Sequence, residues 1–357
     1  MIPRRRLAKR RRGLTLIEVM VTVSLVGVLV SMLLPAVQSV RETARRVQCS
    51  NNVRQWVLAT HNYVSSHRYL PPAFVLQPDS IKRGRGHSWS VHGRLLPHIE
   101  LASADEAIDL STDWHDQVES GIPSARFALG LCPSEPNDHV RHKDGRPYVA
   151  PTSYGFSGGG WHVFTPSTGR GGDGAFIVNG KLTPAAFLDG TSHTLAIAEV
   201  KTYQPYLRNF DNPFAPIPPP VHVKVAKPHL AELHPTEGPG TNDPRIDHLG
   251  QLKTTGHTVW PDGRIHHAGV TTVFPPNHRY DVRRDAVNYD IDFTTAQEGK
   301  YDDRSTFAAV TARSHHVGGV TVGMMDGSVQ FLSDSISTSL YRSLGTRAGH
   351  ESALFDP

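Results

Sequence analysis

Apolar residues dominate one uninterrupted stretch near the N-terminus, from Leu14 to Val37, in which Glu18 is the only ionisable residue. At about 1.5 Å of rise per residue, a helix of this length spans roughly 36 Å, enough to cross a bilayer. The pattern therefore predicts a transmembrane or assembly helix over residues 14–37. Pro35 lies inside the stretch and could kink the helix or loosen one turn.

The apolar pattern changes after Val37 but still permits helix. Residues 38–66 contain no Gly or Pro. One apolar stripe recurs there at helical spacing, formed by Cys49, Val53, Trp56, Val57, Thr60 and Val64. A weaker stripe on nearly the opposite side is formed by Val40, Ala44 and Val47. Because helical spacing of this kind indicates a buried face, we expect an amphipathic continuation whose first stripe packs on a globular head.

The rest of the chain alternates between short apolar runs and turn residues. Gly and Pro make up about 16% of the sequence, above the usual ~12%. The long helix must end near Pro71 and Pro72, because the residue before a proline avoids helical geometry. A short helix or turn is expected at 95–100, and short strands at 175–178, 194–200, 258–260 and 269–274. Residues 210–244 are rich in proline and are expected to form a loop or irregular insertion.

The C-terminal region shows a hairpin pattern. Asp326 and Gly327 separate the strand-like segments 319–325 and 328–332, which indicates a tight turn with positive φ at both central residues. Asp189 and Gly190 have the same chemistry, and we interpret both pairs as structural turns. Ser335 is expected to cap a short helix over 336–344.

These patterns together predict an α+β fold. A long N-terminal helix would pack on a large β-rich, loop-rich head over residues 67–345, followed by a C-terminal tail over 346–357. Residues 1–13 would form a separate leader.

Charge is distributed unevenly. The formal charge is +4, but the first thirteen residues hold seven Lys and Arg. Without them, 30 basic residues face 33 acidic ones, a charge of −3. The basic leader is therefore a topology signal that stays cytoplasmic, and no nucleic-acid partner is expected.

Residues 13–18 read Gly-Leu-Thr-Leu-Ile-Glu, between the basic leader and the apolar run. This order resembles the prepilin signal of type IV pilins and type II secretion pseudopilins. The resemblance implies that a prepilin peptidase cuts after Gly13 and that Leu14 becomes N-methylated. It also implies that Glu18 pairs with the freed amine of Leu14 on a neighbouring subunit, since a carboxylate inside a membrane needs a partner. A plain transmembrane anchor would not explain Glu18, and an ordinary secretory signal has a shorter apolar core.

Further short motifs follow in order along the chain. They lie at 33–38, 45–52, 61–63, 71–72, 131–134, 189–192 with Thr194, Leu195 and Glu199, His315 with 318–320, and 325–329 with Phe331. In this combination the chain resembles domain-of-unknown-function family 1559, bacterial proteins with a prepilin-like N-terminus. The resemblance carries no enzymatic activity with it.

The chain contains two cysteines, Cys49 and Cys132. Outside the cytoplasm of a bacterium two thiols more often pair than stay free, and two are too few for a zinc site alone. We expect a disulfide between them, and the alternative is two buried thiols.

No cofactor is expected. Adjacent histidines occur at 266–267 and 315–316, but no local zinc spacing is present. We expect the histidines on the surface and in turns, with some buried and hydrogen-bonded. Calcium remains an alternative because acidic residues gather in two places, although neither place fits the twelve-residue calcium loop. These residues are Asp285, Asp290 and Asp292, and Asp302 and Asp303.

The expected function is that of a structural pilin-like subunit and not of an enzyme. We expect a single-pass protein of the bacterial inner membrane, with the head periplasmic or extracellular. Its partners would be the prepilin peptidase and methyltransferase, other pilin-like subunits and membrane lipid. Two alternatives keep the anchor: the head binds a secreted cargo or glycan, or it is a tethered hydrolase.

Overall fold

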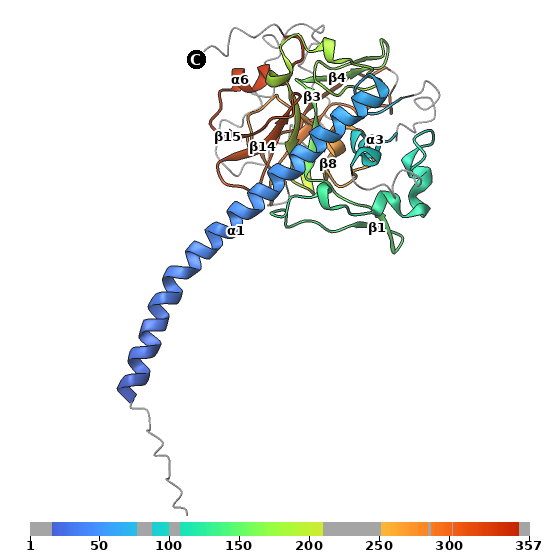
Figure 1. Cartoon of the computed structure of the whole chain (residues 1–357). Coiled ribbons are helices and arrows are strands. Elements are labelled where there is room, and N and C mark those ends of the chain that lie inside the picture. The colour runs from blue at the N-terminus through green and yellow to red at the C-terminus, as the bar shows by residue number, and fades with distance from the viewer. Residues whose placement is uncertain are drawn as a thin grey trace, which may run out of the picture. The chain divides into compact units, whose positions relative to one another are not determined.

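A computed structural model describes residues 16–76, 88–99, 108–209, 251–284, 287–301 and 303–349 (Figure 1). The cleavage residues Gly13 and Leu14 and the expected insertion at 210–244 lie outside these ranges. The chain divides into two compact units, with the boundary between Arg45 and Arg46.

A single long helix, α1 (Leu16–His67), contains this boundary and continues through Pro35. It joins the two helical segments expected from the sequence. In its first half the large apolar side chains are exposed, from 77% at Leu16 to 48% at Val37. Nothing within the described part of this unit covers them, so the first half of α1 presents an apolar surface on all sides.

The second half of α1 has one buried face, as predicted. Its buried residues include Cys49, Val53, Trp56, Val57 and Thr60. The opposite stripe stays exposed, with Val40 at 68% and Val47 at 56%. The period of 3.6 residues places the first stripe on one side of the helix, where it joins the main core of the head.

The head is rich in β-structure, which confirms the α+β fold. A five-stranded sheet has the order β15-β14-β6-β3-β9, with β3 and β9 parallel and the other neighbours antiparallel. Its strands are β3 (Tyr154–Gly159), β6 (Leu195–Glu199), β9 (Gly269–Thr271), β14 (Gly319–Met324) and β15 (Val329–Ser333). Strands β3, β6, β9 and β14 are fully buried, so this sheet forms the centre of the head.

A six-stranded sheet has the order β5-β4-β13-β12-β7-β8, with β12 and β7 parallel. Its strands are β4 (His162–Thr165), β5 (Arg170–Gly171), β7 (Gln204–Arg208), β8 (Gln251–Gly256), β12 (Asp292–Thr294) and β13 (Thr306–Ala309). Two separate hairpins are also present. One pairs β1 (Arg141–Lys143) with β2 (Arg146–Val149), and the other pairs β10 (Asp281–Arg284) with β11 (Val287–Asp290).

Short helices connect and cover the sheets. The α-helices are α3 (Val91–Leu95), α5 (Ile265–Ala268) and α6 (Thr338–Ser343). The 3₁₀ helices are η1 (Leu96–His98), η3 (Trp114–Ser120), η4 (Ile122–Ser124), η5 (Ala128–Gly130), η6 (Pro184–Ala186) and η7 (Thr191–His193). The expected helix at 95–100 corresponds to α3 and η1. Helix α6 is capped by Ser337, whose side chain accepts from the amide of Leu340 at 3.2 Å, and not by Ser335 as predicted.

Helix α1 and the five-stranded sheet pack closely because β14 carries a glycine at the contact. A Cβ built at Gly323 would lie 2.7 Å from Val57 Cγ2 and 2.9 Å from Val53 Cγ1. The ring of Trp56 meets the ring of Phe156 on β3 edge to face, with centroids 5.9 Å apart. The second half of α1 therefore crosses the sheet over β14, β6 and β3 (Figure 1).

Two predicted strands are absent from the described structure. Residues 175–178 and 258–260 are largely buried, but none of them lies in a strand, and 175, 176, 178 and 260 are bends or turns. Each run adjoins a residue with positive φ, Asn179 at 55° and His257 at 54°, which breaks an extended backbone. Both runs are apolar because they are buried, and not because they pair with a neighbouring β-strand.

The β14–β15 hairpin forms where expected, but its turn differs from the prediction. Of the two central residues only Gly327 has a positive φ, of 95°. The amide of Met324 donates to Ser328 O at 2.9 Å, and the amide of Gly327 donates to Met324 O at 3.1 Å. This is a three-residue loop, a turn followed by a left-handed glycine, in which Asp326 needs no positive φ.

Candidate functional site where α1 enters the head

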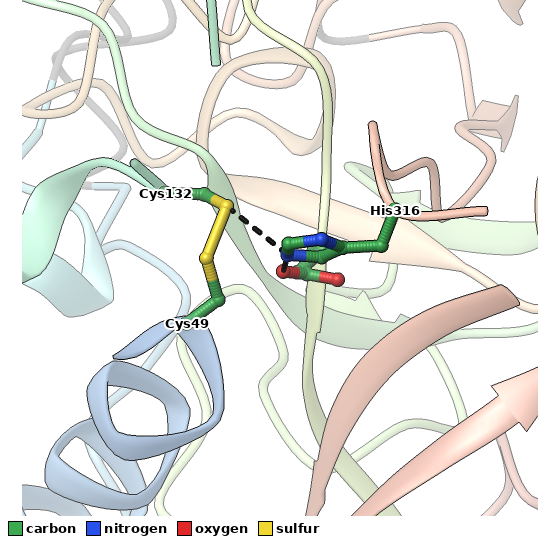
Figure 2. A group of neighbouring side chains, drawn as sticks. Cys49, Cys132 and His316 are labelled. Carbon is green, nitrogen blue, oxygen red and sulfur yellow. Dashed lines mark hydrogen bonds and ion pairs between the residues drawn. A yellow bond between two sulfur atoms is a disulfide. The ribbon is translucent and has the colours of Figure 1, made fainter. Parts of the chain in front are cut away.

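Four buried side chains from distant parts of the sequence meet beside α1. We name Cys49, Cys132, Glu199 and His316 the Cys–His–Glu cluster. Cys49 lies on α1, Cys132 follows η5, Glu199 ends β6 and His316 precedes β14. Figure 2 shows the two sulfur atoms joined and the imidazole of His316 facing them.

Cys49 and Cys132 form a disulfide in the structure, with their Cα atoms 5.2 Å apart. This separation lies inside the ~7 Å limit for a bridge. The bond closes a loop over 83 positions. It joins the second half of α1 covalently to the segment after η5.

His316 contacts two members of the cluster through one nitrogen. Its Nε2 lies 3.5 Å from the sulfur of Cys132 and 3.4 Å from Oε1 of Glu199 (Figure 2). The other carboxylate oxygen of Glu199 accepts the backbone amide of Thr321 at 2.7 Å, which fixes the carboxylate. All four side chains are at most 7% exposed, so their interactions operate away from bulk water.

A second His–Glu pair lies next to the cluster. His315 Nε2 is 3.3 Å from Glu135 Oε2, and Glu135 also accepts the amides of Thr202 and Asn137, each at 3.0 Å. Burial alone would raise the pKa of Glu135, but these hydrogen bonds outweigh it and lower that pKa. Adjacent histidines thus hold two separate carboxylates.

Two polar side chains of α1 join the same segment as the disulfide. Asn52 donates to Leu131 O at 3.3 Å and to the hydroxyl of Tyr154 at 3.2 Å. Trp56 donates through its ring nitrogen to Leu129 O at 2.9 Å. Together with Cys49 these residues follow one helix face over two turns. The segment 129–132 is therefore attached to α1 at three successive points.

The two predicted structural turns lie next to each other. The amide of Asp326 donates to Thr191 O at 3.1 Å. Gly190 has a positive φ of 93°, and Asp189 accepts the amide of Gly349 at 2.6 Å. Both turns therefore organise backbone, and the second also receives the start of the segment expected as a tail.

Two of the acidic residues considered for calcium have another partner in the structure. Arg313 pairs with Asp292 and, at 3.0 Å, with Asp290. Asp285 and Asp302 lie outside the described residues. Asp303 is exposed.

Some histidines are buried, as expected, and His92 and His257 are hydrogen-bonded there, whereas His266 is not. His92, His257, His266 and His267 are all buried, and neither ring nitrogen of His266 makes a hydrogen bond. Burial lowers the pKa of each, to about 3 for His92 and His267 and about 4 for His257. The head therefore holds a group of neutral imidazoles in its core.

Glu18 lies in the first turn of α1 as the structure describes it, among exposed apolar side chains. This helix is long and apolar enough to cross a membrane. No residue within its most apolar stretch is buried. A carboxylate in such a position is costly in lipid, which makes Glu18 a candidate functional residue.

Sequence reasoning missed His316 and Glu199 as neighbours of the disulfide. A sequence feature pointed to each residue, because Glu199 ends one of the short motifs and His316 belongs to a histidine pair. Their convergence depends on how β6 and the loop before β14 meet α1, which no local spacing encodes.

Two family models match the chain. Residues 8–34 match the prokaryotic N-terminal methylation motif, so the chain has the N-terminus of a prepilin-peptidase-processed, pilin-like protein. Residues 38–339 match a family described as protein of unknown function (DUF1559), and the chain belongs to this family. No curated protein and no solved structure matches the chain.

Proposed function

We propose that this protein is a structural, non-enzymatic subunit of a type II secretion or type IV pilus-like assembly. It is processed after Gly13, methylated at Leu14 and held in the bacterial inner membrane with its head on the far side. The observation that carries the proposal is the exposed apolar half of α1 with Glu18 in its first turn. Lipid covers such a surface before assembly, and neighbouring helices cover it afterwards.

The structure of the head supports this role. A subunit that is moved by its helix must transmit force from the helix to the head. Cys49, Asn52 and Trp56 attach α1 to segment 129–132, and Arg46 lies 3.4 Å over the ring centre of Phe331 on β15. These attachments begin within the first turns of the second compact unit and join the second half of α1 to the rest of that unit.

Crosslinking of subunits in membranes tests the proposal. Glu18→Ala removes the carboxylate that pairs with the freed amine of Leu14 in a neighbour, so crosslinked oligomers should fall strongly while membrane insertion persists. Glu42→Ala is the matched control, because Glu42 lies outside the apolar run and pairs with Arg45 at 2.7 Å. Equal crosslinking of both variants and wild type would remove the basis for the assembly role.

The same variants address the alternative role of the head. The head is unchanged in Glu18→Ala, so a subunit that acts only by binding cargo or glycan would retain that ligand and its export phenotype. Loss of the phenotype together with loss of crosslinks favours the assembly role.

A further inference from the structure

The Cys–His–Glu cluster combines two sulfur atoms, an imidazole nitrogen and a carboxylate oxygen, which all lie within 4.8 Å of one another. We propose that, when the disulfide is reduced, Cys49, Cys132, His316 and Glu199 bind one divalent transition metal ion of the zinc type. This inference does not depend on the proposed assembly role.

The chemistry of the ligands selects the metal. Two thiolates with one imidazole and one carboxylate suit zinc and similar ions, whereas calcium and magnesium prefer oxygen ligands alone. A structural zinc site has four protein ligands in tetrahedral array, and this cluster supplies four.

Two of the distances between ligand atoms already match such a site. Metal bonds of about 2.3 Å to sulfur and about 2.0–2.1 Å to nitrogen or oxygen place S and N roughly 3.5 Å apart, and N and O roughly 3.4 Å apart. The structure has 3.5 Å between Cys132 Sγ and His316 Nε2 and 3.4 Å between that nitrogen and Glu199 Oε1. The two sulfurs must separate to roughly 3.8 Å, and the four ligand atoms already lie within 4.8 Å of one another.

The surroundings of the cluster also favour a bound ion. Oε1 of Glu199 is buried and makes no hydrogen bond, while Oε2 is fixed by the amide of Thr321. The hydrogen bond at Oε2 thus holds the carboxylate, and Oε1 lies near the sulfurs and the imidazole. Cys132 also borders a surface depression lined by Leu131 and Glu135, which provides an entry path.

The oxidised and metal-bound forms exclude each other. A dithiol reductant delivers two electrons and two protons to the disulfide and is itself oxidised to a disulfide. The two protein thiols then lose their protons as they bind the metal, since thiolates are the ligands. Either form ties α1 to segment 129–132, so the attachment persists in reducing and in oxidising surroundings.

The test uses the full chain in detergent, reduced under anaerobic conditions by a phosphine that does not bind the metal, with Co²⁺ as the probe. The reduced protein should bind one Co²⁺ per chain with thiolate-to-cobalt charge-transfer absorption, and Zn²⁺ should displace it. The oxidised protein should show neither. His316→Gln and Glu199→Gln should weaken binding by roughly tenfold or more, because loss of even an outer partner costs that much.

The neighbouring pair supplies matched controls. His315→Gln and Glu135→Gln remove a His and a Glu just outside the cluster and should bind Co²⁺ like wild type. Circular dichroism of each reduced sample shows whether the chain stays folded. The proposal is wrong if folded, reduced wild type gives no thiolate–cobalt band, or if His316→Gln and His315→Gln bind alike. It is also wrong if reduction unfolds the chain and added metal does not restore it.

Discussion

The two halves of α1 share one continuous helix and differ in everything that surrounds them. From Leu16 to Val37 the helix is exposed and apolar, with one carboxylate. From Cys49 to Tyr63 one face is buried and attached by a disulfide, hydrogen bonds and ring contacts. The first half therefore suits contacts with a partner outside this chain, whereas the second half packs on the head of its own chain.

This difference separates stability from assembly. Changes in the second half should alter the free energy of unfolding of the head, because its partners lie in the same unit. Changes in the first half should leave that free energy unaltered and affect only association. The experiments below measure head stability from the largest expected effect to the smallest.

Removal of the disulfide should have the largest effect. Cys132→Ser releases a loop closed over 83 positions, which we expect to cost about 4 kcal/mol of unfolding free energy. Urea unfolding of oxidised wild type and the variant measures this cost. Non-reducing peptide mapping supplies the complementary check, since two freely alkylated thiols in folded wild type would contradict the bridge.

Acidification should have the next largest effect. The unfolded histidines bind protons below pH ~6.5, whereas His92, His257, His266 and His267 are held neutral by burial. The unfolded state therefore binds more protons, and stability falls as the pH drops below about 6.5.

Buried acids oppose this trend, among them Asp173, whose pKa burial raises. Burial raises the pKa of Glu298 to about 7 and that of Asp292 to about 6. Each acid therefore binds more protons in the folded state, and it stabilises that state as the pH falls toward the pKa of the same acid in the unfolded chain. Because the four buried histidines outnumber these acids, the unfolded state still binds more protons between pH 6 and 5, and the free energy of unfolding should fall on acidification. Unfolding midpoints measured from pH 7 to 5 test the sign, and a midpoint that rises on acidification would refute the histidine argument.

A substitution at the contact between α1 and the sheet should have a smaller effect. In Gly323→Val the new side chain meets Val53 and Val57 at less than 3.0 Å, so we expect a loss of about 1–3 kcal/mol from overpacking. Gly160→Ala is the control, because its Cβ would have only ordinary contacts with Asp173, the nearest at 3.5 Å. Thermal melts of the two variants should differ, and equal melts would show that α1 does not pack there.

The smallest effect belongs to the first half of the helix. Glu18→Ala should change the unfolding free energy of the head by no more than about 0.5 kcal/mol, as for a surface substitution. The same variant should lose intersubunit crosslinks. A large loss of head stability would show that the two halves of α1 are not energetically separate.

The same contrast explains what the sequence could predict. The apolar run and the buried stripe could be predicted from the sequence. Burial in a membrane requires an apolar composition, and packing of one helix face requires apolar residues at a period of 3.6. The turn at Asp326 and Gly327 was found, but its type was not, because the loop length depends on which residues of β14 and β15 pair.

The candidate site was predictable only in part. A disulfide between Cys49 and Cys132 could be expected because the chain has two cysteines and thiols outside the cytoplasm more often pair than stay free, with two buried thiols as the alternative. His316 and Glu199 join them through tertiary packing across 117 positions of sequence, a separation at which no spacing rule operates. The strands predicted at 175–178 and 258–260 are absent for a related reason, because a buried segment need not pair with another strand.

The mature N-terminus is the most direct test of the central claim that this is a processed, pilin-like subunit. Intact mass spectrometry of the membrane-extracted protein should show a chain that begins at Leu14, lacks the leader and carries one added methyl group. A mature chain that begins at Met1, or that starts near Ala36 after cleavage beyond the apolar run, would contradict it.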